Sequence, residues 1–228
     1  MNTTLVRNPL IEHRLLVILC IFYTISSLTS AILVARLMQI GPLLLPGGIF
    51  IFPFSYAIID IVAELYGYQL ASKLILSLSI GSIFYAMYVF FILHVPYPAW
   101  WQHNDNYQQV LSSSMRLVFW GVIANYLASK LNAFVLVKLK LLLKGKSFPI
   151  RSIIASSIGE LLLTTLVYVG VMFGTASISN IILLGISGYF VKVMLAILLA
   201  FPSQLVVAYA KRTGSFSNME PNLKQTVC

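Results

Sequence analysis

Two carboxylates stand one helical turn apart in the stretch FPFSYAIIDIVAELYGY, residues 52–68, which is otherwise apolar enough to cross a bilayer. They are Asp60 and Glu64, and Phe52 and Tyr56 continue the same four-residue spacing towards the N-terminus. On a helix this spacing places all four side chains on one face. Rings can stack on a flat solute while carboxylates accept hydrogen bonds from its edge, so the spacing predicts a binding site for a planar molecule.

Two later segments repeat polar side chains at helical spacing: Asn125, Ser129 and Asn132 in the first, and Ser156, Glu160, Thr164 and Tyr168 in the second. Such side chains also form contacts between membrane helices, and that alternative stays open. No catalytic residue, metal ligand or cofactor is predicted. The predicted substrate-binding residues are Phe52, Tyr56, Asp60, Glu64, Asn125, Asn132, Glu160, Thr164 and Lys192.

Ionisable residues inside the apolar segments are Asp60, Glu64, Lys130, Glu160 and Lys192. Each costs about 2.5–3.5 kcal/mol near a helix centre. Their positive and negative charges nearly balance, which suggests that they neutralise one another. At the depths expected from the six spans, Asp60, Lys130, Glu160 and Lys192 could meet in one layer of the bundle. Structural ion pairs, Asp60–Lys192 or Glu160–Lys130, are an alternative, and Glu64 could be solvated near the interface. Because membrane carboxyl groups often relay protons, Asp60 or Glu160 could also take up and release a proton.

The elements that must hold these residues are membrane-spanning helices. Of the 228 residues, 59% are hydrophobic and only 9% are charged, with a mean hydropathy of +0.92. This composition excludes a soluble domain. Runs of about 20 apolar residues predict an all-α integral membrane protein with six transmembrane helices, at roughly 15–36, 49–66, 74–95, 112–137, 152–174 and 181–209.

Lysine and arginine predict the orientation. With six spans, most basic residues fall on one side, whereas the opposite loops carry only Arg36 and Arg116. Both termini are therefore expected to be cytoplasmic. The net charge of +9 is attributed to this topology signal and not to nucleic-acid binding. The expected domains are a cytoplasmic tail at 1–14, a six-helix transmembrane domain at 15–209 and a cytoplasmic, disordered tail at 210–228.

The stretch RLMQIGPLLLPGGIFIFPFSYAIIDIVAELYG resembles the signature region of the queuosine precursor transporter family, also called the VUT or putative vitamin uptake transporter family. The matching positions are Arg36, Gly47, Gly48, Phe52, Pro53, Tyr56, Asp60, Glu64, Tyr66 and Gly67, followed by the weaker landmarks Arg116, Gly159, Thr164, Lys192 and Pro202. The chain departs from the family pattern at Ala128, Ser129, Asn132, Glu160 and Leu163.

The resemblance implies a transporter domain of six helices in the bacterial inner membrane that imports a 7-deazaguanine precursor or queuine for tRNA queuosine salvage. It implies a small-molecule 7-deazapurine substrate and surrounding lipid, with no nucleic acid and no obligate protein partner, although a homodimer is compatible with it. Asp60, with Glu64 beneath it, would then accept hydrogen bonds from the donor edge of the ring.

Two other functions compete with a solitary carrier. A substrate-binding subunit of an energy-coupling-factor importer would also be a small six-helix protein, and it would require partner ATPases. An intramembrane enzyme is disfavoured, because Asp60 and Glu64 share one helix and no Ser–His pair or HExxH motif is present. The chain is therefore expected not to be an enzyme.

Overall fold

The computed structural model describes residues 9–34, 36–41, 43–98, 100–101, 103–112, 114–172 and 177–212. Within these ranges six helices are long and apolar enough to cross a membrane, which confirms the predicted all-α, six-span fold. They are α1 (Pro9–Leu33), α2 (Phe52–Tyr66), α3 (Tyr68–His94), α5 (Ser114–Leu142), α6 (Phe148–Val167) and α7 (Ile178–Arg212). A 3₁₀ turn, η1 (Gly47–Phe50), precedes α2, and a π-helical turn, η2 (Tyr168–Met172), continues α6.

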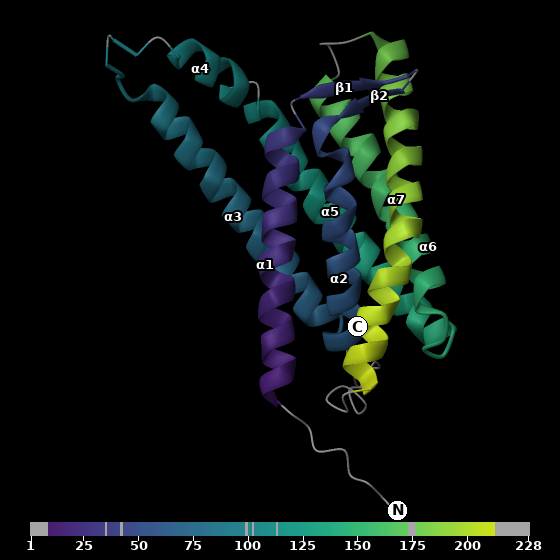
Figure 1. Ribbon diagram of the computed structural model, residues 1–228. Coiled ribbons are helices and arrows are strands. Elements are labelled where there is room, and N and C mark those ends of the chain that lie inside the picture. Colours follow the sequence, from purple (N-terminus) through teal and green to yellow (C-terminus); the bar gives the residue numbers. More distant parts are fainter. Residues whose placement is uncertain are drawn as a thin grey trace, which may run out of the picture.

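The start of α1 and the end of α7 lie at the same end of the bundle, together with the α2–α3 and α5–α6 connections (Figure 1). We call this the terminal end. This arrangement is the one an even number of spans requires. The expected tails at 1–14 and 210–228 lie largely outside the described residues, since α1 already begins at Pro9 and α7 continues to Arg212.

A short hairpin lies at the opposite end of the bundle, which we call the hairpin end (Figure 1). Strands β1 (Leu37–Ile40) and β2 (Leu43–Pro46) pair antiparallel, with Leu37 opposite Pro46. The sequence predicted only a break here. Two four-residue strands are too short to show the alternation by which a strand is recognised, so hydropathy could not reveal the pairing.

Several helices run past the apolar windows that predicted them. Helix α3 starts at Tyr68, not near residue 74, so that only Gly67, with φ of 87°, separates it from α2. Helix α5 continues to Leu142, and the third loop contains a further short helix, α4 (Asn104–Ser112). Polar and charged residues can extend a helix beyond the bilayer, and hydropathy detects the span but not this extension.

Helix α2 is the most enclosed of the spans. In its apolar window 67% of residues are buried, against 17–39% in the others, and it contacts α1, α3, α5, α6 and α7. Apolar side chains from α1, α2, α3, α5, α6 and α7 pack around its second half, including Val62, Leu136 and Ala155. The helices are therefore closely packed towards the terminal end.

Helices α5 and α6 approach closely at Gly159. A Cβ atom at this position would lie 2.8 Å from Tyr56 Cε1, 3.0 Å from Asn132 Cβ and 3.1 Å from the backbone oxygen of Ala128. The absence of a side chain thus lets three helices meet beside the acidic face of α2.

Gly159→Ala is expected to destabilise the protein by about 1–3 kcal/mol, because a methyl group must push α6 away from α2 and α5. Gly81→Ala is the matched control, since no atom lies within 4 Å of its added Cβ. Melting temperatures in detergent check this. A Gly159→Ala protein that melts at or above the wild-type temperature would contradict the close packing.

Candidate functional site

The predicted face of α2 points into the bundle. Tyr56 is 3% exposed, Asp60 0% and Glu64 3%, and the Phe52 and Tyr56 rings lie 5.4 Å apart. The stripe therefore runs through the protein interior, from the aromatic residues near the hairpin end to Glu64 near the terminal end (Figure 1). Its two acids have entirely different surroundings.

Glu64 is held by three cations from three other helices. Its carboxylate accepts hydrogen bonds from Arg151 Nη1 at 2.9 Å and from Lys211 Nζ at 2.6 Å, and Lys140 Nζ lies 3.5 Å away. Lys140 Nζ also donates to the Glu64 backbone oxygen at 2.9 Å. The side chains of both Glu64 and Arg151 are fully buried. We call these four residues the Glu64 cluster; it ties α2 to α5, α6 and α7, and Glu64 is not solvated.

Sequence reasoning missed the other three members of this cluster. Lys140, Arg151 and Lys211 were assigned to loops and a tail because they follow or precede apolar runs. Their positive charges were used only to predict the orientation in the membrane. Glu64 was expected near the same end of the bundle, and this shared depth is the signal that could have suggested it as their partner.

Asp60 lies among neutral hydrogen-bond donors. Asn132 Nδ2 donates to its Oδ1 at 2.7 Å, while Ser152 Oγ and Ser156 Oγ donate to its Oδ2, the latter at 3.3 Å. Within the described residues it makes no ion pair. The polar stripes thus meet at Asp60, as helical spacing indicated for Asn132 and Ser156, whereas Ser152 had not been singled out.

A second acid, Glu160 on α6, pairs with Lys192 on α7. The Lys192 Nζ to Glu160 Oε2 distance is 3.1 Å, and Nζ also lies 5.1 Å from the centroid of the Phe52 ring. This is neither of the two pairs considered from the sequence. Lys130 does not join the expected layer of charges, because its Nζ donates to Tyr126 Oη on the same helix.

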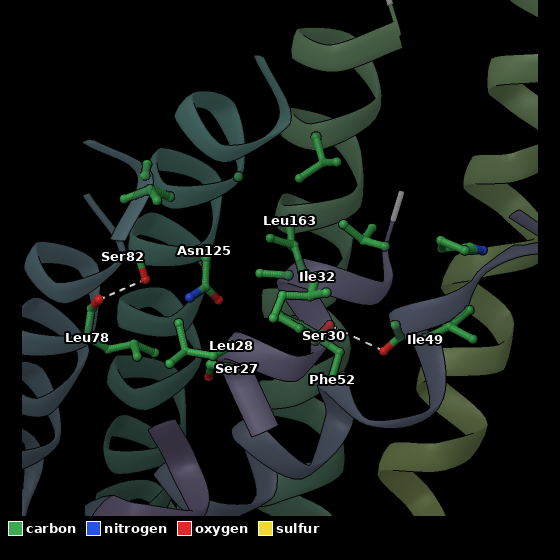
Figure 2. A pocket seen from close by; sticks show the side chains of 18 of the residues that line it. Ser27, Leu28, Ser30, Ile32, Ile49, Phe52, Leu78, Ser82, Asn125 and Leu163 are labelled. Carbon is green, nitrogen blue, oxygen red and sulfur yellow. Dashed lines mark hydrogen bonds between the residues drawn. The ribbon is translucent and has the colours of Figure 1, made fainter. Parts of the chain in front are cut away.

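A cavity of about 210 Å³ lies between the helices (Figure 2). Its lining includes Leu37 and Pro46 of the hairpin, so it lies in the half of the bundle nearer the hairpin end. Its wall is mostly apolar, as at Leu28, Ile49 and Leu163 (Figure 2). Four of the predicted site residues line it: Phe52, Asn125, Thr164 and Lys192. The other five, Tyr56, Asp60, Glu64, Asn132 and Glu160, do not line this cavity.

Several buried polar atoms beside the cavity have no hydrogen-bond partner among the described residues. They are Tyr56 Oη, Thr164 Oγ1, Asn132 Oδ1 and Glu160 Oε1. Leaving such an atom unpaired costs about 1–3 kcal/mol, and such groups in native proteins usually bind water or a ligand. These atoms belong to α2, α5 and α6, and one of them, Thr164 Oγ1, comes from a residue that lines the cavity.

The arrangement suits binding of a small solute. The part of the chain that the structure describes contains no group of three or more His, Cys, Asp or Glu side chains that could hold a metal ion. Helix α1 adds Ser27 and Ser30 to the cavity wall (Figure 2). Neither residue was predicted from the sequence to belong to the site.

Comparison with known proteins identifies the family. A family model described as putative vitamin uptake transporter matches residues 46–207. No curated protein and no solved structure matches the chain significantly. The matched segment runs from the end of β2 into α7, so it includes Phe52, Asn125, Thr164 and Lys192 at the cavity. The chain therefore belongs to the putative vitamin uptake transporter family and is a multi-pass membrane transporter.

Proposed function

We propose that this protein imports a queuosine precursor, 7-cyano-7-deazaguanine, 7-aminomethyl-7-deazaguanine or queuine, across the bacterial inner membrane for tRNA queuosine salvage. The observation that carries the proposal is the cavity, whose mostly apolar wall also contains the Phe52 ring, the Asn125 carboxamide and the Lys192 ammonium group. About 210 Å³ is below the roughly 300–1,000 Å³ of pockets for drug-sized ligands. This size favours a compact solute such as a single base.

The distribution of basic residues supports transport in the direction of import. The terminal end of the bundle carries Lys73, Lys138, Lys140, Lys144, Lys146, Arg151, Lys211 and Arg212, whereas Arg36 lies at the hairpin end. By the positive-inside rule the terminal end is cytoplasmic. The cavity then faces the outer half of the membrane, where an imported base arrives.

The packed half of the bundle supports alternating access. Between the cavity and the cytoplasmic end lie Asp60, the apolar core and the Glu64 cluster. A solute can pass only if these contacts separate while the outer half closes. In this scheme Asp60 and Glu160, the acids nearest the cavity, are the candidates for proton coupling.

Complementation tests the proposal. The protein is expressed in a bacterium that can neither make nor import queuosine precursors and that has no energy-coupling-factor ATPases. Each base is supplied separately at low concentration, and queuosine in tRNA is measured. We expect one or more bases to restore queuosine. If none does so despite confirmed membrane insertion, the substrate assignment fails.

A cavity-filling variant ties the result to the site. Gly121 lines the cavity and an added Cβ there meets no atom within 4 Å, so Gly121→Leu should fill the cavity without disturbing α5. Queuosine is expected to fall to the level of the empty vector. Gly81 does not line this cavity but a second one, of about 230 Å³, and its added Cβ also meets no atom within 4 Å. Gly81→Leu should therefore leave queuosine unchanged. Equal activity of both variants would argue against the cavity as the binding site.

The alternative is a substrate-binding subunit of an energy-coupling-factor vitamin importer. The observation that favours this alternative is the description of the matching family as a vitamin uptake transporter. Restoration of queuosine in a host without the ATPases would exclude it. Failure there, followed by success when the ATPases are co-expressed and co-purify with the chain, would establish it.

A further inference from the structure

Of the three carboxylates from Asp60, Glu64 and Glu160, one has an oxygen left for a ligand. Both oxygens of Asp60 accept hydrogen bonds from neutral donors. Both oxygens of Glu64 pair with cations. Glu160 Oε1 has no hydrogen-bond partner in the described part of the chain, although the residue is only 1% exposed.

The partner of Glu160 is at the cavity itself. Lys192 lines the cavity and remains 12% exposed, and its Nζ lies 3.1 Å from Glu160 Oε2. Thr164, one turn beyond Glu160 on α6, also lines the cavity, and its Oγ1 is buried without a hydrogen bond. The cavity wall therefore presents an ammonium group and an unpaired hydroxyl. The carboxylate that pairs with this ammonium group lies outside the wall, and its Oε1 has no hydrogen bond in the described part of the chain.

This order of groups complements a particular molecular edge. A ring carbonyl followed by a ring N–H and an exocyclic amine presents one acceptor and then two donors. An ammonium group can donate to the carbonyl, while a carboxylate accepts from two adjacent N–H groups in bidentate fashion. An adenine-type edge, or a solute bearing its own carboxylate, would instead place an acceptor against Glu160.

We infer that Glu160 and Lys192 recognise the lactam and amino edge of a guanine-type base, with the Phe52 ring beside them as an apolar contact. The inference rests on the proposed function and names the chemical group that the transporter selects. It gives Glu160 the role of accepting hydrogen bonds from the donor edge of the ring, which the family resemblance implied for Asp60 and Glu64. The carboxylate reaches the base when its pair with Lys192 opens to admit the base between them.

A competition assay on the purified protein tests this inference. Binding is measured for 7-deazaguanine, for 7-deazahypoxanthine, which lacks the exocyclic amine, and for 7-deazaadenine, which lacks the lactam. The wild type is expected to prefer 7-deazaguanine over each of the others by about 10–100-fold, the effect of one buried unpaired polar group. In Glu160→Gln the preference over 7-deazahypoxanthine should shrink to less than about threefold.

Two further variants make the outcome decisive. Glu160→Asp keeps the carboxylate and should retain the preference, which shows that loss in Glu160→Gln is not general misfolding. Asp60→Asn should also retain it. The inference is overturned if Asp60→Asn loses the preference while Glu160→Gln keeps it, or if the wild type binds all three bases equally. If no base binds at all, the proposed function itself fails, and the two failures are thereby distinguished.

Discussion

Replacing Glu64 with glutamine is expected to destabilise the protein by about 3–5 kcal/mol, since it leaves Arg151 buried and charged without its partner. The Arg151 side chain is fully buried, and its Nε already donates to the Lys146 backbone oxygen at 2.9 Å, so the guanidinium cannot simply move to water. Lys140 and Lys211 would also lose their shared acceptor. The measurement is the melting temperature or the free energy of unfolding in mixed detergent.

Two controls separate this effect from a general loss of charge. Asp105→Asn removes an exposed carboxylate on α4 and should change stability by no more than about 0.5 kcal/mol. The double variant Glu64→Gln with Arg151→Met should recover much of the loss, because the fully buried charge of Arg151 is then removed and the two remaining cations, Lys140 and Lys211, are partly exposed. If Glu64→Gln costs no more than Asp105→Asn, the Glu64 cluster does not hold the helices together at the terminal end.

Replacing Asp60 with asparagine is expected to abolish accumulation driven by a pH gradient while leaving exchange of base for base intact. The three groups that donate to Asp60 are neutral, so in our proposal its charge is balanced by a proton that travels with the substrate. Asparagine has nearly the same shape and keeps one acceptor oxygen, but it cannot carry that proton. Proteoliposomes with an imposed pH gradient, compared with counterflow without one, separate the two activities.

The outcome for Glu160→Gln completes this test. If Asp60→Asn still accumulates base in response to the gradient, Asp60 is not the proton carrier. Loss of the response in Glu160→Gln alone would then assign the role to the residue that pairs with Lys192. Loss in neither variant would contradict proton coupling through either acid.

The face of α2 and the six spans could be predicted from sequence because both depend on local patterns. Phe52, Tyr56, Asp60 and Glu64 share one face for the same reason in any helix, and apolar windows of bilayer length mark spans wherever they occur. Membership of the family was also visible in the block from residue 46 to residue 67, which lies inside the segment that the family model matches.

The partners of the charges could not be predicted, because they depend on how each helix is rotated and how far it extends. Lys192 pairs with Glu160 and not with Asp60, and this choice follows from the relative rotation of α6 and α7. Lys140, Arg151 and Lys211 reach Glu64 because their helices continue past the apolar windows. Hydropathy carries no information on either property.

Transport by this chain is tested most directly by measuring uptake of a labelled 7-deazaguanine base into proteoliposomes that contain only this protein. We expect saturable uptake faster than in empty liposomes, retained in Gly81→Leu and lost in Gly121→Leu, in which the leucine should occupy the cavity. Uptake no faster than in empty liposomes, by protein shown to be folded and inserted, would contradict the claim that this chain alone carries such a base through that cavity.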